Sequence, residues 1–201
     1  MMKSPLLPSL SKNRLSLLAL LLTATFLISG CGIILVTTAA VSAIDVIRDR
    51  REIGTLWDDN KMELSLRQSI SKNEQIDNAN VSVTAFNGIA LLTGEVPDQR
   101  AIDQILDLAK SHPDASQVIN RIELAGKTNL NSRANDSWIT GRVKSAMLTS
   151  GTIDTTKIKV VTERANVYLM GLVSRSEAEA AVVVTRSVPG VVRVIKVFEY
   201  L

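Results

Sequence analysis

The pattern of hydrophobic and polar positions occurs twice along the chain. Residues 59–96 align with residues 136–173 without a gap, at a shift of 77. One residue is then dropped, and the match continues at a shift of 76 to the end of the second copy. Self-similarity of this kind indicates two domains of one type. We therefore predict domains over 59–125 and 135–201, joined by a polar linker rich in turn formers at 126–134.

The first half of each copy predicts a helix followed by a hairpin. Apolar residues four apart follow Asp59 and Asp136, which predicts a helix with an aspartate N-cap. Alternating apolar residues then predict two strands with a tight turn between them. The turn of the first copy is Asn87-Gly88, a strong hairpin signal, whereas Arg164-Ala165-Asn166 in the second copy is a weaker one.

The second half of each copy predicts a helix and a closing strand. The helix should start after Asp98 in the first copy and after Ser174 in the second, where Ser174-x-x-Glu177 is a capping-box pattern. The element order is therefore αββαβ in both copies. The predicted fold class is α+β, with each domain a small mixed three-stranded sheet packed against two helices.

The residues before the repeat read as an export signal. Lys3, Lys12 and Arg14 precede an uncharged apolar run, and small residues then lead to Cys31. A positive start, an apolar stretch and a small-residue cleavage site are typical of a signal peptide. Ile28-Ser29-Gly30-Cys31 resembles the bacterial lipobox, in which the thiol accepts a diacylglycerol. We expect residues 1–30 to be cleaved, leaving Cys31 as the lipidated N-terminus of a tether over 31–58.

Two other interpretations of this segment stay open. One is an ordinary signal peptide with an incidental cysteine. The other is an uncleaved membrane span, because apolar residues continue beyond Cys31 and no charge occurs between Arg14 and Asp45.

The two copies resemble the BON domain. The αββαβ order, the leading aspartate, the Leu-x-Gly of the second strand and the Pro-Gly near residue 190 carry the resemblance. A lipobox followed by two such domains resembles the dual-BON outer-membrane lipoproteins. The first copy departs from the pattern, since His112-Pro113-Asp114 replaces the usual Pro-Gly. This departure concerns the binding role of the first domain more than its fold.

The resemblance implies a function and a location. It implies phospholipid binding and support of cell-envelope integrity, including at the cell-division site, and it implies no catalysis. Gly32, rather than aspartate, follows the cysteine, which by resemblance to lipoprotein sorting favours the outer membrane. We thus expect a lipid-anchored, periplasm-facing protein with no cofactor beyond the diacylglycerol and acyl chain, such as palmitate, on Cys31. Its partners would be an anionic phospholipid membrane and outer-membrane or division-site proteins, and not nucleic acid.

Charge is distributed unevenly between the copies. The chain has 23 basic and 20 acidic residues, but three of the basic residues belong to the predicted signal peptide. The mature chain is therefore neutral, and the basic balance does not argue for nucleic-acid binding. Residues 59–125 hold six basic and ten acidic residues, whereas residues 135–201 hold nine basic and six acidic ones. The second copy is the one suited to an anionic surface.

Few residues suggest catalysis or metal binding. His112 is the only histidine, and its place near a helix end is explained by the helix dipole. Cys31 is the only cysteine, and lipidation would consume it. We expect neither a catalytic nor a metal site.

A candidate lipid-binding face lies on the first helix of the second copy. At 100° per residue, Trp138 and Leu148 point away from the apolar face that should pack on the sheet. Arg142 and Lys144 lie at the two margins of the same outward face. An indole at headgroup depth with cations on phosphate suits a lipid interface.

Alternatives to this site also stay open. Trp138 could instead pack on the first domain or the linker, or anchor a protein partner in an outer-membrane assembly complex. Lys157 and Lys159 are interpreted as a solvated face of the first strand in the second copy. Trp57 has no counterpart in the second copy and is expected to cover an edge of the first domain.

Overall fold

The computed structural model describes residues 53–201 except 74–75, 77–78 and 127–129, so the predicted signal peptide and Cys31 lie outside the described residues. The described residues belong to one compact unit. The first domain comprises α3 (Ile53–Lys72), β1 (Asn80–Phe86), β2 (Ile89–Val96), α4 (Gln99–Lys110) and β3 (Gln117–Leu124). The second comprises α5 (Leu130–Ser150), a short 3₁₀ helix η1 (Thr155–Lys157), β4 (Lys159–Glu163), β5 (Asn166–Val173), α6 (Arg175–Arg186) and β6 (Arg193–Tyr200).

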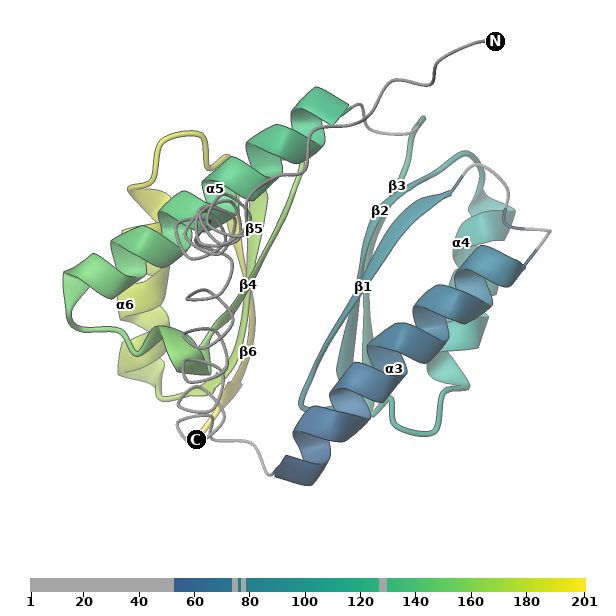
Figure 1. The fold of residues 1–201 in the computed structure, drawn as a ribbon, viewed down its shortest axis with the longest axis horizontal. Coiled ribbons are helices and arrows are strands. Elements are labelled where there is room, and N and C mark those ends of the chain that lie inside the picture. Colours follow the sequence, from purple (N-terminus) through teal and green to yellow (C-terminus); the bar gives the residue numbers. More distant parts are fainter. Residues whose placement is uncertain (1–52, 74–75, 77–78, 127–129) are drawn as a thin grey trace, which may run out of the picture. The chain divides into compact units, whose positions relative to one another are not determined.

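Each domain has a three-stranded mixed sheet with two helices packed against it. In the first sheet β2 is central, antiparallel to β1 and parallel to β3, and in the second sheet β5 is central in the same way. Figure 1 shows α3 and α4 beside the first sheet and α5 and α6 beside the second. The predicted α+β class and αββαβ order are confirmed.

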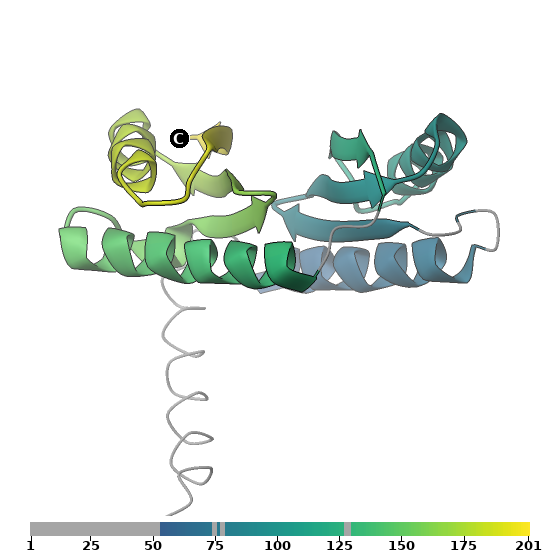
Figure 2. The same cartoon turned by 90° about the horizontal axis from the view of Figure 1, so that it is seen from above.

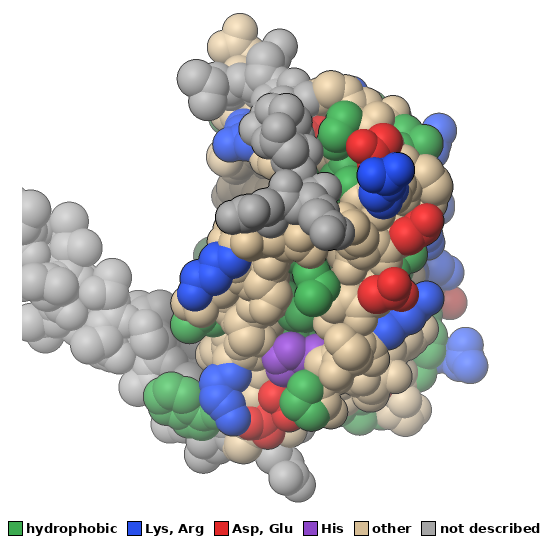
Figure 3. All heavy atoms as spheres, turned by 90° about the vertical axis from the view of Figure 1, so that its right-hand side faces the viewer, with side chains coloured by type: hydrophobic (Ala, Val, Ile, Leu, Met, Phe, Trp, Pro, Cys, Tyr) green, Lys and Arg blue, Asp and Glu red, His purple; other side chains and the backbone are tan. Residues whose placement is uncertain are grey.

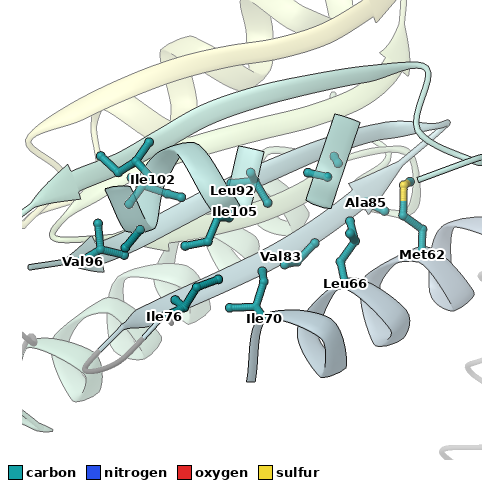
Figure 4. Packing of buried hydrophobic residues seen from close by; sticks show 14 residues of the cluster. Met62, Leu66, Ile70, Ile76, Val83, Ala85, Leu92, Val96, Ile102 and Ile105 are labelled. Carbon is teal, nitrogen blue, oxygen red and sulfur yellow. The ribbon is translucent and has the colours of Figure 1, made fainter. Parts of the chain in front are cut away.

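The core of each domain lies between its helices and its sheet. In the first domain, apolar residues four apart on α3 face the inward residues of β1 and β2 (Figure 4). The matching residues Ile139, Val143 and Met147 of α5 are fully buried in the second core. Burial of such large apolar side chains is the main stabilising contribution within each domain.

The first helix of each domain begins earlier than the sequence predicts. α3 starts at Ile53 and α5 at Leu130, so Asp59 and Asp136 lie within helices and are not N-caps. α5 thus also takes in part of the segment that the sequence interprets as linker. Instead, the two buried carboxylates accept hydrogen bonds from the backbone of the hairpin turns.

The second helices start where the sequence predicts. Asp98 caps α4 by accepting a hydrogen bond from the backbone N–H of Ala101. Ser174 and Glu177 form a reciprocal capping box at the start of α6. These contacts satisfy backbone donors that the first turn of a helix leaves unpaired.

The face of each sheet that is turned away from its own helices is also buried in part, chiefly on the central strands. A third apolar cluster joins β1 and β2 to β5 and β6, and its buried members are Phe86, Ile89, Leu91, Tyr168, Met170 and Val197. As a result, all eight residues of β2 are buried. The first domain therefore packs on the second through their sheets.

Polar contacts surround this apolar cluster. Lys159 contacts Glu63 of α3 and donates a hydrogen bond to the Ala85 carbonyl oxygen, 3.0 Å away. Arg164 donates to Glu123 at 2.6 Å and lies 3.5 Å from the fully buried Glu95. Charged groups at such positions fix how the two surfaces align more than they add to affinity.

These contacts correct the interpretation of the two lysines. Lys157 belongs to η1 and not to the strand, and it forms ion pairs with Asp154 and Glu177 at 3.5 and 3.6 Å. Lys159 lies between the domains. Neither lysine forms a solvated sheet face, because each has found a carboxylate partner.

Candidate functional site

The outward face of α5 carries the four residues that the sequence selects. Figure 2 shows α5 along one side of its domain. Trp138 is 50% exposed and Leu148 is 69% exposed, while Arg142 and Lys144 are also exposed. The fold does not require large apolar residues at these positions, since Lys61 occupies the matching position to Trp138 in the first repeat.

Trp138 and Arg142 form one unit. The guanidinium carbon of Arg142 lies 4.8 Å from the centre of the indole ring, the geometry of a cation–π contact. The indole also reaches the turn at Gly190, where an added Cβ would lie 3.6 Å from the ring. Both contacts lie within the second domain. They hold the indole in a fixed place while half of its surface stays open.

Lys144 and Leu148 form a second pair one turn apart on the same helix. Trp138 and Leu148 are ten residues apart, so about 15 Å of helix axis separates them. Between them the outward face has Gly141 and Ser145, and nothing lies within 4 Å of a Cβ built on Gly141. Small residues here let the helix backbone approach a flat surface closely.

The positive charge on the outward face of α5 favours the binding of anions. Between residues 137 and 150 this helix has Arg142 and Lys144 and no acidic residue. Within the part of the chain that the structure describes, neither cation forms an ion pair. Both charges are therefore available to an anionic ligand.

The turn that supports Trp138 is not evident from the helix pattern. Gly190 has a φ of +92°, and a Cβ there would lie 3.4 Å from Ile139, next to the indole. The neighbouring Val192 is also exposed. The available signal was Pro189-Gly190, which the first repeat replaces with Pro113-Asp114.

Trp57 does not cover the edge of the first domain, contrary to expectation. Its side chain is 68% exposed on the first turns of α3, one turn before Lys61. Lys61 forms an ion pair with Asp58 at 3.1 Å, which raises the pKa of the Lys61 ammonium group. The cation one turn from Trp57 is thus neutralised by an ion pair. Among the described residues, Arg142 beside Trp138 has no such ion pair.

His112 takes part in a contact that resembles part of a catalytic triad. It follows the end of α4, and its Nε2 lies 2.6 Å from the Ser65 hydroxyl of α3. Figure 3 shows the imidazole in purple at the surface. The backbone N–H of Asp114 donates to Nδ1 at 3.2 Å, so Nε2 carries the proton and donates to Ser65. A histidine that donates to the serine cannot act as its base, and this contact joins α3 to the loop after α4.

The described residues offer no site for a metal ion and no membrane span. Among them, no group of three or more histidine, cysteine, aspartate or glutamate side chains could hold a metal. No helix within the described ranges is long and apolar enough to cross a bilayer.

Comparison with known families places the chain in one class. The model of the BON domain matches residues 58–126 and 135–201. The chain therefore belongs to the BON-domain family, with two copies of the domain.

Comparison with individual proteins narrows this class. The chain is 36% identical over 185 residues to the outer membrane lipoprotein DolP of Haemophilus influenzae, covering 92% of this chain and 95% of that protein. It is also 36% identical over 154 residues to a 21 kDa hemolysin of Actinobacillus pleuropneumoniae, with 76% and 79% covered. The osmotically-inducible protein Y of Escherichia coli is 22% identical over 158 residues, with 77% and 79% covered. The expected class, a DolP-like dual-BON lipoprotein of the outer membrane, is confirmed.

Solved structures also give a match. CdsD, a structural protein of the type III secretion system of Chlamydia trachomatis, matches with a TM-score of 0.29 and 14% identity, covering 71% of this chain and 63% of that one.

Proposed function

We propose that this protein is a non-enzymatic lipoprotein that binds anionic phospholipid through α5 of its second BON domain and supports envelope integrity. The observation that carries the proposal is the stacked Trp138–Arg142 pair, exposed on a helix face that the fold does not need to be apolar. The indole would enter the headgroup region while Arg142 and Lys144 meet phosphate.

A shallow contact of this kind suits a protein that also has a lipid anchor. The diacylglycerol and the acyl chain expected on Cys31 would already hold the protein at the membrane, so the contact made by α5 needs to be only weak. The 21 residues between Cys31 and Ile53 could extend to at most about 75 Å. This reach allows the second domain to meet the membrane that holds the anchor, at a high effective concentration.

Vesicle binding by the soluble fragment 45–201 tests the proposal. Trp138→Ala should lower affinity for anionic vesicles by roughly tenfold, with little change in salt dependence, because it removes apolar insertion. Arg142→Glu/Lys144→Glu should also weaken binding and flatten its salt dependence, since each cation contributes roughly 1 kcal/mol near an anionic surface. Circular dichroism would confirm that both variants are folded.

The first domain supplies the controls. Lys61→Ala changes the position that matches Trp138, and Trp57→Ala removes the other exposed tryptophan. Both variants should bind anionic vesicles like the wild type. If folded Trp138→Ala binds normally, the lipid-facing helix is wrong and the role of Trp138 as a protein anchor gains support. If Trp57→Ala loses binding instead, the site belongs to the first domain.

A further inference from the structure

A second surface of the second domain lies between α6 and β6, away from the outward face of α5. A groove of about 420 Å³ separates the outer face of α6 from the last strand. The lining residues that define it are Arg175, Val182, Val183, Arg186, Lys196 and Tyr200. In Figure 2, α6 and the yellow C-terminal end of the chain lie beside each other.

The strand that borders the groove has a free edge. Among the residues that the structure describes, β6 pairs with β5 alone, because the sheet order is β4-β5-β6. The edge of β6 therefore presents backbone N–H and C=O groups that a further strand could bind. Lys196 and Tyr200 share the helix-side face of β6 with Phe198, which packs in the core. The side chains of an added strand would point from that edge into the groove.

The groove is lined by apolar side chains and by positively charged ones. Val183 is 68% exposed on α6, and the guanidinium carbon of Arg175 lies 4.9 Å from the ring centre of Tyr200, which is 43% exposed. Arg175, Arg186 and Lys196 are opposed only by Glu179 among the charged residues that line the groove. None of these three cations forms an ion pair within the described ranges.

The first domain shows that the fold does not require these features. At the same places, α4 and β3 have Asp107 for Val183, Lys110 for Arg186 and Asn120 for Lys196. Gln99 stands for Arg175, and Asp103 matches Glu179. The matching surface therefore carries two carboxylates and one cation, whereas the groove of the second domain carries three cations and one carboxylate.

We infer that this groove binds an extended, acidic segment of a partner protein, which adds a strand to the edge of β6. Strand addition gives affinity through main-chain hydrogen bonds, and pockets for alternate side chains give specificity. Acidic side chains of the segment pair with Arg186 and Lys196, and an apolar side chain between them covers Val183. A groove closed on one side by a strand edge fits a polypeptide better than a flat bilayer surface.

The test uses the full-length lipoprotein in nanodiscs of uncharged phosphatidylcholine and a short fluorescein-labelled peptide. Every second residue of this peptide is threonine, and the others alternate between valine and glutamate, so that valine and glutamate share one face of a strand. Fluorescence anisotropy should show saturable binding. Arg186→Glu/Lys196→Glu should weaken it by about tenfold or more, because two attractive pairs become repulsive. A peptide with lysine for glutamate, or with N-methylated alternate amides, should lose binding.

Matched variants locate the site. Lys110→Glu/Asn120→Glu makes the same changes in the first domain and should leave peptide binding unchanged, as should Trp138→Ala on the lipid-facing helix. The inference is overturned if the N-methylated peptide binds as well as its parent, or if both double variants behave alike. It is also overturned if Arg186→Glu/Lys196→Glu lowers binding to anionic vesicles while peptide binding persists, since the groove would then be a lipid site.

Discussion

Two buried aspartates each join the first helix of a domain to its hairpin turn. Asp59 accepts hydrogen bonds from the backbone N–H groups of Asn87 and Gly88 at 2.7 and 2.8 Å. Asp136 does the same for Arg164 and Ala165 at 2.9 and 2.8 Å. From the sequence these residues resemble N-caps, because both roles require a carboxylate that accepts backbone N–H groups. Only the true starts of α3 and α5 distinguish the two roles.

The hydrogen bonds that Asp136 accepts hold two non-glycine residues of the hairpin turn in the left-handed region. Arg164 and Ala165 have φ values of +48° and +59°, whereas the matching turn of the first domain ends in Gly88. A side chain in this region costs roughly 1–2 kcal/mol. Ala165→Gly should therefore raise the free energy of unfolding by roughly 0.5–1 kcal/mol, after the greater freedom of glycine in the unfolded chain is allowed for. Urea denaturation would measure this gain.

The reciprocal change at the matching position serves as its control. Gly88 has a φ of +76°, and an added Cβ would lie 2.8 Å from the Ser116 hydroxyl oxygen. Gly88→Ala should therefore destabilise the protein. Equal effects of the two substitutions would contradict the conformational argument.

At the scale of the elements, the Leu-x-Gly motif has a steric cause. The carbonyl oxygens of Asn80 and Lys157, which match in the two repeats, pass over Gly94 and Gly171. A Cβ on Gly94 would lie 1.9 Å from the first oxygen, and one on Gly171 would lie 2.5 Å from the second. The central strand of each sheet thus needs glycine where the backbone that leads into the hairpin comes closest to it.

This geometry predicts a ranking of three alanine substitutions. Gly94→Ala should destabilise most, by roughly 3 kcal/mol or more, because it also forces alanine to a φ of +119°. Gly171→Ala should destabilise less. Gly141→Ala, in the middle of α5 with nothing near its Cβ, should stabilise by about 0.5–1 kcal/mol. Thermal denaturation of the three variants checks the order, and a stable Gly94→Ala protein would refute the steric argument.

The elements themselves were largely predictable. Spacing by four identified the buried residues of α3 and α5, and 100° per residue correctly placed Trp138 and Leu148 on the exposed face. The stack of Arg142 on Trp138 also follows from their separation by one helical turn. The support from Gly190 was not predictable, because it depends on how the loop after α6 returns to α5.

At the scale of the whole molecule, the packing of sheet on sheet was missed. Its signal was the strand Ile89-Ala90-Leu91-Leu92, which is apolar on both faces and therefore needs cover on both. Which surface provides that cover could not be read from the repeat, because β5 is also apolar on both faces, with Val167 and Leu169 on one face and Tyr168 and Met170 on the other. The contact of Lys159 with Glu63 was hidden for the same reason, since its partner is distant in sequence.

Three acidic side chains lie close together beside the packed sheets. The side chain of Glu163, at the end of β4, is partly buried near Glu95 of β2 and Asp136 of α5. Burial, and then repulsion by these two carboxylates, raises the pKa of Glu163 to about 7 from its ordinary value of 4.5, although Arg133 and Arg164 oppose the shift. The folded state therefore binds this proton more tightly than the unfolded state does.

The sign of the pH dependence follows from this raised pKa. The stability that protonated Glu163 contributes is fully present below about pH 4.5 and is lost as the pH rises through about 7. Glu163→Gln keeps a neutral side chain at every pH. At pH 8 this substitution should raise the free energy of unfolding by roughly 1 kcal/mol, after allowance for solvent screening of a partly exposed group. At pH 4 it should leave the free energy of unfolding almost unchanged.

Thermal melts of the wild type and Glu163→Gln across this pH range provide the measurement. Glu179→Gln, an exposed glutamate of α6, is the matched control and should follow the wild type throughout. The difference in melting temperature between wild type and Glu163→Gln should grow between pH 4.5 and 7. Only in this interval does the charge of Glu163 differ between the folded and unfolded states. If the two melting curves stay parallel over that interval, Glu163 titrates normally and the carboxylates beside the packed sheets do not interact.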